Sequence, residues 1–137
     1  MPDIVVRHEG GDRFRVRVRD HELRVDQPVE DGGGDTGPTP TELFVAGLAA
    51  CVGFYAERFL YRHALPTEGL AVECDFAFAE DGPARVASAA LRVTLPAGFP
   101  ESKRERLARV VEHCTVHNSI RHAPSIRIEL EAAADAA

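Results

Sequence analysis

A long uncharged segment near the middle of the chain limits the possible folds most strongly. It opens on Thr39-Pro40-Thr41-Glu42, which combines a capping threonine, a proline at the first helical position and a glutamate three residues after the cap. This pattern is typical of a helix start. No charged residue occurs from 43 to 56. We therefore expect a helix from Pro40 to about His63 that is apolar on all sides and forms the buried centre of the fold.

Three short segments before this helix predict a β meander. Hydrophobic and charged residues alternate in the middle segment, and tight turns at Gly10-Gly11 and Asp20-His21 separate the three. The segments are residues 4–7, 13–19 and 23–25. Between them and the helix, residues 27–37 are polar and glycine-rich, which predicts a loop without regular structure.

Two longer strands and a second helix are predicted after the long helix. The strands cover residues 70–79 and 85–95. From about Glu101, apolar residues recur at the spacing of one helix face, at Leu107, Val110, Val111 and Cys114. We therefore expect Cys114 on the core-facing stripe of this helix, with a turn near Asn118.

The last part of the chain predicts one more strand, because three aliphatic residues alternate with Arg127 and Glu129 over residues 126–130. The sequence has no internal repeat and no linker with domains on both sides. We interpret residues 1–137 as one domain with the long helix at its buried centre.

Composition and charge exclude several classes of function. Hydrophobic residues make up 45% of the chain and charged residues 28%, which fits a globular protein with a real core. The formal net charge of −6 argues against a nucleic-acid partner bound through its phosphates. Glu57 and Arg58 break the longest apolar run, and the first residues lack a stretch of signal-peptide length. We expect a cytoplasmic protein with no membrane partner.

Cysteines are the main candidates for chemistry. There are three, Cys51, Cys74 and Cys114, and their odd number and wide spacing are unlike a secreted disulfide framework. Free cysteine is among the most buried residue types, so each could be a small core hydrophobe. We hold that interpretation for Cys74, which lies within a predicted strand. The other two lie on apolar helix faces that could pack together.

Two motifs contain these two cysteines. Residues 37–51 read GPTPTELFVAGLAAC, and residues 114–119 read CTVHNS. Together they resemble the OsmC/Ohr superfamily, the osmotically inducible and organic hydroperoxide resistance proteins. The order of predicted elements is similar to that family over nearly the whole chain.

The resemblance implies an α+β fold that forms an intertwined homodimer, with each site built from both subunits. It implies a thiol peroxidase that reduces small hydrophobic hydroperoxides with a dithiol reductant and no bound cofactor. Cys51 matches the peroxidatic cysteine and Cys114 the resolving one. In such chemistry a thiolate, favoured by a nearby cation, attacks the O–O bond. The second thiol traps the resulting sulfenic acid before further oxidation.

Arg13 and Glu42 are the candidate supporting residues. In the best-characterised reductases of this family, an arginine from the first strands pairs with a glutamate directly after the helix-starting proline. Here Thr41 follows Pro40, and the glutamate comes one position later. Glu42 is therefore either a catalytic acid or the acid of a capping box. Arg13 is the first choice for the thiolate partner and Arg15 the second, although alternating arginines are also typical of a solvated strand face.

Two other functions stay open. One is a binding protein without peroxidase activity that uses the cleft at its dimer interface, a hypothesis favoured by the shifted glutamate. The other is a metal site at Cys51, Cys114 and His117, because histidines crowd around Cys114. Their spacing matches no zinc pattern, so we expect no metal.

Overall fold

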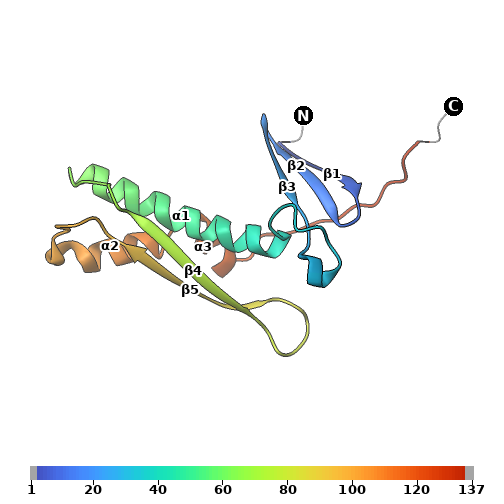
Figure 1. Ribbon diagram of the computed structural model, residues 1–137. Helices are drawn as coiled ribbons and strands as arrows, with labels where there is room; N and C mark the ends of the chain where they lie inside the picture. The colour runs from blue at the N-terminus through green and yellow to red at the C-terminus, as the bar shows by residue number, and fades with distance from the viewer. Residues whose placement is uncertain (1–2, 135–137) are drawn as a thin grey trace.

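The long helix α1 (Pro40–Arg62) organises the second half of the molecule (Figure 1). In this computed structural model, which describes residues 3–134, a hairpin of two strands and two short helices pack along α1. These elements are β4 (Ala71–Phe78), β5 (Val86–Thr94), α2 (Arg104–Val111) and α3 (Thr115–Arg121). A separate three-stranded sheet stands at the N-terminal end of α1 (Figure 1). The chain is thus an α+β fold with two antiparallel sheets, as expected.

The first sheet is the predicted meander. Its strands are β1 (Ile4–Gly10), β2 (Arg13–Val18) and β3 (His21–Val25), paired antiparallel in the order β1-β2-β3. The connecting turns fall at residues 11–12 and 19–20, so each differs by one residue from its predicted position. Both turns use left-handed backbone, with φ of 53° at Gly11 and at Arg19.

The start of α1 is confirmed in detail. The Glu42 amide donates to Thr39 Oγ1 at 3.0 Å, and the Thr39 amide donates to Glu42 Oε1 at 2.9 Å. This reciprocal pair satisfies two amides that would otherwise lack partners at the helix start. Proline occupies the first helical position, and the helix ends at Arg62, one residue before the predicted end.

Burial of α1 differs from the prediction. One face is buried, at Val45, Leu48, Val52, Ala56, Phe59 and Leu60, whereas several large apolar side chains on other faces are exposed. Phe54 is 51% exposed and Tyr61 is 74% exposed. The prediction of a helix buried on all sides is therefore wrong for a single chain, because the other elements cover only one face.

By length and composition α1 could also span a membrane, but core helices pass the same test, so this is weak evidence.

The loop between β3 and α1 is more ordered than predicted. It contains a short 3₁₀ helix, Val29–Asp31, and folds around the buried carboxylate of Asp26. That carboxylate accepts hydrogen bonds from the Thr36 hydroxyl at 2.6 Å and from three backbone amides. The Thr36 hydroxyl and these amides hold the pKa of Asp26 at about 2. A Cβ on Gly37 would lie 2.3 Å from the Arg24 carbonyl oxygen, so only glycine fits this close approach.

The hairpin of β4 and β5 is confirmed, but the following helix is not continuous. The chain forms a 3₁₀ turn at Glu101–Lys103 and then α2, which ends at Val111. Cys114 has extended backbone with ψ of 154° and caps the separate helix α3. The prediction of Cys114 on the stripe of the second helix is therefore wrong, as is the turn near Asn118, which lies within α3.

The predicted last strand is also absent from the single chain. Residues 123–134 form neither helix nor strand in the described part of the chain. The aliphatic side chains that suggested a strand are exposed by 77% at Ile126, 81% at Ile128 and 95% at Leu130. Their alternation fits a strand, but within residues 3–134 this segment pairs with no other strand.

Candidate thiol site

The thiol site forms where α1 meets the start of α3. Cys51 lies in the fourth turn of α1, and Cys114 precedes the first residue of α3. Cys114 is fully buried in a cluster with Leu48 and Val52, and the half-buried Cys51 packs against the same cluster. Both cysteines are free thiols. The fold thus brings together two cysteines that are 63 residues apart in the sequence.

Backbone amides of α3 contact both sulfur atoms. The Val116 amide donates to Cys51 Sγ at 3.5 Å, and the His117 amide donates to Cys114 Sγ at 3.4 Å. A hydrogen bond of 2.7 Å between Tyr55 Oη and Thr115 Oγ1 joins α1 to α3 one turn further on. Hydrogen bonds to sulfur favour the thiolate, so the first turn of α3 can stabilise negative charge on either cysteine.

The two thiols have different environments. Burial raises the pKa of Cys114, and the neighbouring Cys51 sulfur raises it further, while the His117 and Val116 amides act in the opposite direction. Desolvation disfavours a charged thiolate, so Cys114 stays protonated at neutral pH. Cys51 is half-buried and therefore accessible to a small reactant. The arrangement suits a more accessible first thiol and a buried second one.

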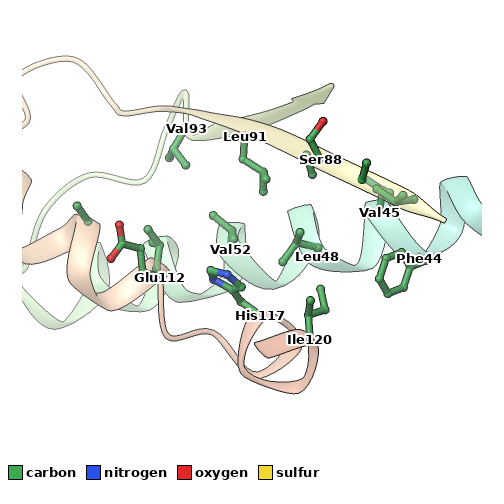
Figure 2. Close-up of a pocket in the computed structure, with 15 residues that line it drawn as sticks. Phe44, Val45, Leu48, Val52, Ser88, Leu91, Val93, Glu112, His117 and Ile120 are labelled. Atoms are coloured by element: carbon green, nitrogen blue, oxygen red, sulfur yellow. The ribbon is translucent and has the colours of Figure 1, made fainter. Parts of the chain in front are cut away.

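An apolar cleft of about 540 Å³ lies beside the thiols. Figure 2 shows β5 on one side, with Leu91 and Val93, and α3 on the other, with His117. The cleft is not lined by either sulfur. Leu48 and Val52 line the cleft and also pack against Cys114. The thiol pair and the cleft therefore share one wall.

Glu42 is placed in the helix cap and not at the thiols of its own chain. Its carboxylate accepts the Thr39 amide, and nine residues of helix separate it from Cys51. At 1.5 Å per residue, that is about 13 Å along the axis. Within one chain, Glu42 is therefore a capping acid.

Arg13 and Arg15 also lie away from the thiols of their own chain. The Arg13 guanidinium donates to the Glu9 carbonyl at 3.4 Å, within the first hairpin. Arg15 forms an ion pair with the Glu9 carboxylate at 2.7 Å. Although burial acts in the opposite direction, Arg24 and Arg15 hold the pKa of Glu9 below its usual value. In the single chain both arginines belong to the meander.

The histidines near Cys114 do not form a metal site. His113 Nδ1 donates to the Arg109 carbonyl at 2.7 Å, His117 lines the cleft, and His122 is exposed at the end of α3. Within residues 3–134, no group of three histidine, cysteine or acidic side chains could hold a metal ion. The metal hypothesis therefore has no support in the described part of the chain.

Cys74 does not belong to the core cluster that contains Cys51 and Cys114. It is on β4 opposite Leu91, and its Sγ is 3.7 Å from the Asp75 carbonyl oxygen.

The sequence analysis did not identify the Tyr55 and Thr115 contact. The signal for it was the position of Tyr55, one turn after Cys51 on the same face of α1.

The fold and the thiol pair together define a class of α+β proteins with two facing cysteines, one on a long helix and one at the start of a later helix. A sequence model of the OsmC-like protein family matches residues 32–129. The chain belongs to this family, which confirms the resemblance. No curated protein sequence matches this chain significantly.

Solved structures are similar over most of the chain. One is a Psychrobacter arcticus 273-4 protein named as an osmotic stress induced and detoxification response protein, with a TM-score of 0.80 and 21% identity over 87% of this chain and 88% of that one. The OsmC like protein of Mycoplasma pneumoniae has a TM-score of 0.75 and 17% identity over 88% and 87%. The organic hydroperoxide resistance protein OhrB of Bacillus subtilis has a TM-score of 0.64 and 22% identity over 88% and 91%. These likenesses show the fold.

Proposed function

We propose that this protein is a thiol-dependent peroxidase that reduces organic hydroperoxides through Cys51 and Cys114. The observation that carries the proposal is the pair of free thiols in one core cluster, one half-buried and one fully buried with a raised pKa. Family membership supports it, since some structurally similar relatives are named as organic hydroperoxide resistance proteins. The apolar cleft beside the pair suits a hydrophobic hydroperoxide.

The reaction has three steps. The Cys51 thiolate attacks the outer oxygen of the hydroperoxide, the O–O bond breaks, and the departing alkoxide takes a proton to become the alcohol. Cys51 is thereby oxidised to a sulfenic acid. The Cys114 thiol attacks that sulfur, forming the disulfide, and its proton leaves with the hydroxyl group as water. An external dithiol then reduces the disulfide by exchange and restores both thiols.

The proposal includes a homodimer, because the single chain leaves too much surface uncovered. The chain exposes 10479 Å², whereas a compact monomer of 14.9 kDa exposes roughly 7,000 Å². The excess includes large apolar side chains such as Tyr61 on α1 and Ile128 near the end of the chain. A second copy would cover this surface and offer a pairing partner for residues 126–130.

We further propose that Arg13 supports the thiolate of a second copy. A nearby cation stabilises a nucleophilic thiolate. The meander that carries Arg13 is a separate sheet at the N-terminal end of α1 (Figure 1), and we expect it to contact the second copy. Its partner in that role is not Glu42 of the same chain, which is engaged in the helix cap.

Substitution of each cysteine tests the mechanism. With excess dithiothreitol, Cys51→Ser is expected to lose cumene hydroperoxide reduction entirely, because no neighbouring group can replace the nucleophile. Without added thiol, Cys114→Ser is expected to consume one equivalent and then stop, and any further turnover is expected to depend on external thiol. Excess peroxide should then add about 32 or 48 Da to Cys51, the mass of two or three oxygen atoms.

The matched control is Cys74→Ser, which removes a thiol outside the pair and should keep full turnover. Activity retained in Cys51→Ser would show that Cys51 is not the nucleophile. Failure of Cys114→Ser to consume even the first equivalent of hydroperoxide would show that Cys114 is not merely the resolving thiol. A wild-type protein that consumes no hydroperoxide with any dithiol would refute the proposal as a whole.

A second candidate is a binding protein that holds an apolar ligand without reducing it. The observation that favours it is the cleft of about 540 Å³, which neither sulfur lines. Under this hypothesis an apolar fluorescent probe binds the cleft, and Leu48→Asp abolishes binding while hydroperoxide is left unconsumed. Hydroperoxide turnover by the wild-type protein would decide for the peroxidase.

A further inference from the structure

A second pocket lies further along α1, between its C-terminal half and α2. Its volume is about 390 Å³, within the range of small-molecule sites. Three arginines line it, Arg58 and Arg62 from α1 and Arg106 from α2, together with the aromatic residues Phe54, Tyr55 and Phe59. No sulfur atom lines this pocket. It is therefore distinct from the thiol site, with which it shares only Tyr55 as a neighbour.

The three arginines have no acidic partners. Within residues 3–134 none of them forms an ion pair, and no acidic side chain lines the pocket. By contrast, Arg104 and Arg109 near Arg106 pair with glutamates at 2.8 and 3.4 Å. Three like charges at one pocket repel one another. In a chain with a net charge of −6, this pocket is a local positive site that an anion would neutralise.

The other walls of the pocket are aromatic. The Arg58 guanidinium carbon lies 5.0 Å from the centre of the Phe54 ring, a cation–π contact. Phe59 stacks on His63 with ring centres 4.0 Å apart. These contacts hold flat apolar surfaces beside the positive charges. A ligand that fills the pocket must therefore present an apolar body as well as a negative group.

We propose that this pocket binds an amphiphilic carboxylate, a small anion whose carboxylate is held by the arginines and whose apolar body lies against the aromatic rings. The planar guanidinium group matches a carboxylate with two parallel hydrogen bonds. Arg58 and Arg62 are four residues apart and share one face of α1, and Arg106 approaches from α2. The proposal does not depend on the peroxidase activity, because an unreactive carboxylate serves as the ligand.

Calorimetric titration of the full-length protein tests this assignment with octanoate as the probe. Octanoate is expected to bind with an affinity that falls as salt concentration rises, since the guanidinium groups supply the attraction. Two comparators separate the requirements of the site. 1-Octanol has the apolar chain without the charge, and inorganic phosphate has the charge without the chain. Neither is expected to bind at the concentrations that saturate octanoate binding.

Variants locate the site. Arg62→Gln and Arg106→Gln are each expected to raise the octanoate Kd about tenfold or more, because each removes a charged hydrogen-bond donor. The matched control is Arg121→Gln, which removes a helical arginine that does not line the pocket. Circular dichroism confirms that each variant is folded, and Arg62→Gln carries the test if Arg106→Gln is not.

Three results would overturn the proposal. Equal binding of 1-octanol would show an apolar groove with no need for the arginines. Equal binding of phosphate would show an unspecific basic patch. An unchanged octanoate Kd in both pocket variants would place the ligand elsewhere.

Discussion

The two cysteines of the thiol site are the same residue type in contrasting surroundings, and this contrast supports the proposed roles. Cys51 is half-buried and accepts the Val116 amide. Cys114 is fully buried, and burial raises its pKa. A thiolate forms more readily where solvent or hydrogen bonds stabilise its charge. The residue-level difference therefore favours Cys51 as the nucleophile and Cys114 as the thiol that resolves the sulfenic acid.

Alkylation as a function of pH measures this contrast. At about pH 7.5, iodoacetamide is expected to modify Cys51 well before Cys114, because a raised pKa keeps Cys114 as the unreactive thiol. The rate of Cys114 modification should still be rising with pH at the ordinary cysteine pKa of 9.0, because the raised pKa delays formation of the thiolate. Trypsin separates the three cysteines into peptides 25–58, 63–85 and 110–121, so mass spectrometry reads each rate independently.

The same raised pKa affects stability. The folded state holds the Cys114 proton more tightly than the unfolded chain, so this contribution is complete below the unfolded pKa and is lost as pH rises through the folded one. Unfolding in the wild type should become easier at alkaline pH, and Cys114→Ala should reduce that pH dependence. Faster alkylation of Cys114 than of Cys51 at neutral pH would contradict the assigned roles.

At the scale of elements, the helix cap decides how Glu42 is interpreted. Glutamine can accept the same hydrogen bond as glutamate in a capping box but carries no charge. Glu42→Gln is therefore expected to keep both the melting temperature and the hydroperoxide activity. Thr39→Val removes the capping oxygen and should cost about 1 kcal/mol, which lowers the melting temperature by a few degrees. Loss of activity in a stable Glu42→Gln protein would instead show a catalytic carboxylate.

Local signals made α1, the meander and the hairpin of β4 and β5 predictable from the sequence. The capping residues, the glycine turns and the strand alternation act over a few residues. The structure contains the elements that these three signals predict. The break before Cys114 was missed because Val111 and Cys114 keep the spacing of one helix face across residues 112–113, where the helix ends. Helix periodicity alone does not distinguish a stripe residue from a cap.

The candidate site was predictable only in part. The cysteine pair followed from the apolar faces around it and from the family motifs. Local patterns do not relate Arg13 to Cys51, because the two residues are 38 positions apart in the sequence and lie in different elements, β2 and α1. The predicted strand at 126–130 is absent for a similar reason. A strand forms only when it pairs with another strand, and the alternation of its own residues does not identify that partner.

For the whole molecule, the uncovered apolar surface predicts a stable homodimer. Sedimentation at micromolar concentration should give about twice the 14.9 kDa of one chain, with an interface above about 2,000 Å² in total. Ile128→Asp should weaken the dimer, because it places a charge among exposed aliphatic side chains. Arg127→Asp introduces the same residue on the alternate side and should leave the dimer largely intact. A stable wild-type monomer would refute this expectation.

The central claim is that Cys51 and Cys114 form one redox pair, and a thiol count tests it most directly. The reduced chain has three thiols. One equivalent of cumene hydroperoxide is expected to leave one thiol, Cys74, with peptides 25–58 and 110–121 joined by a disulfide. Cys51→Ser should keep both of its thiols under the same treatment. Three thiols remaining in the treated wild type, or a disulfide that includes Cys74, would contradict the account.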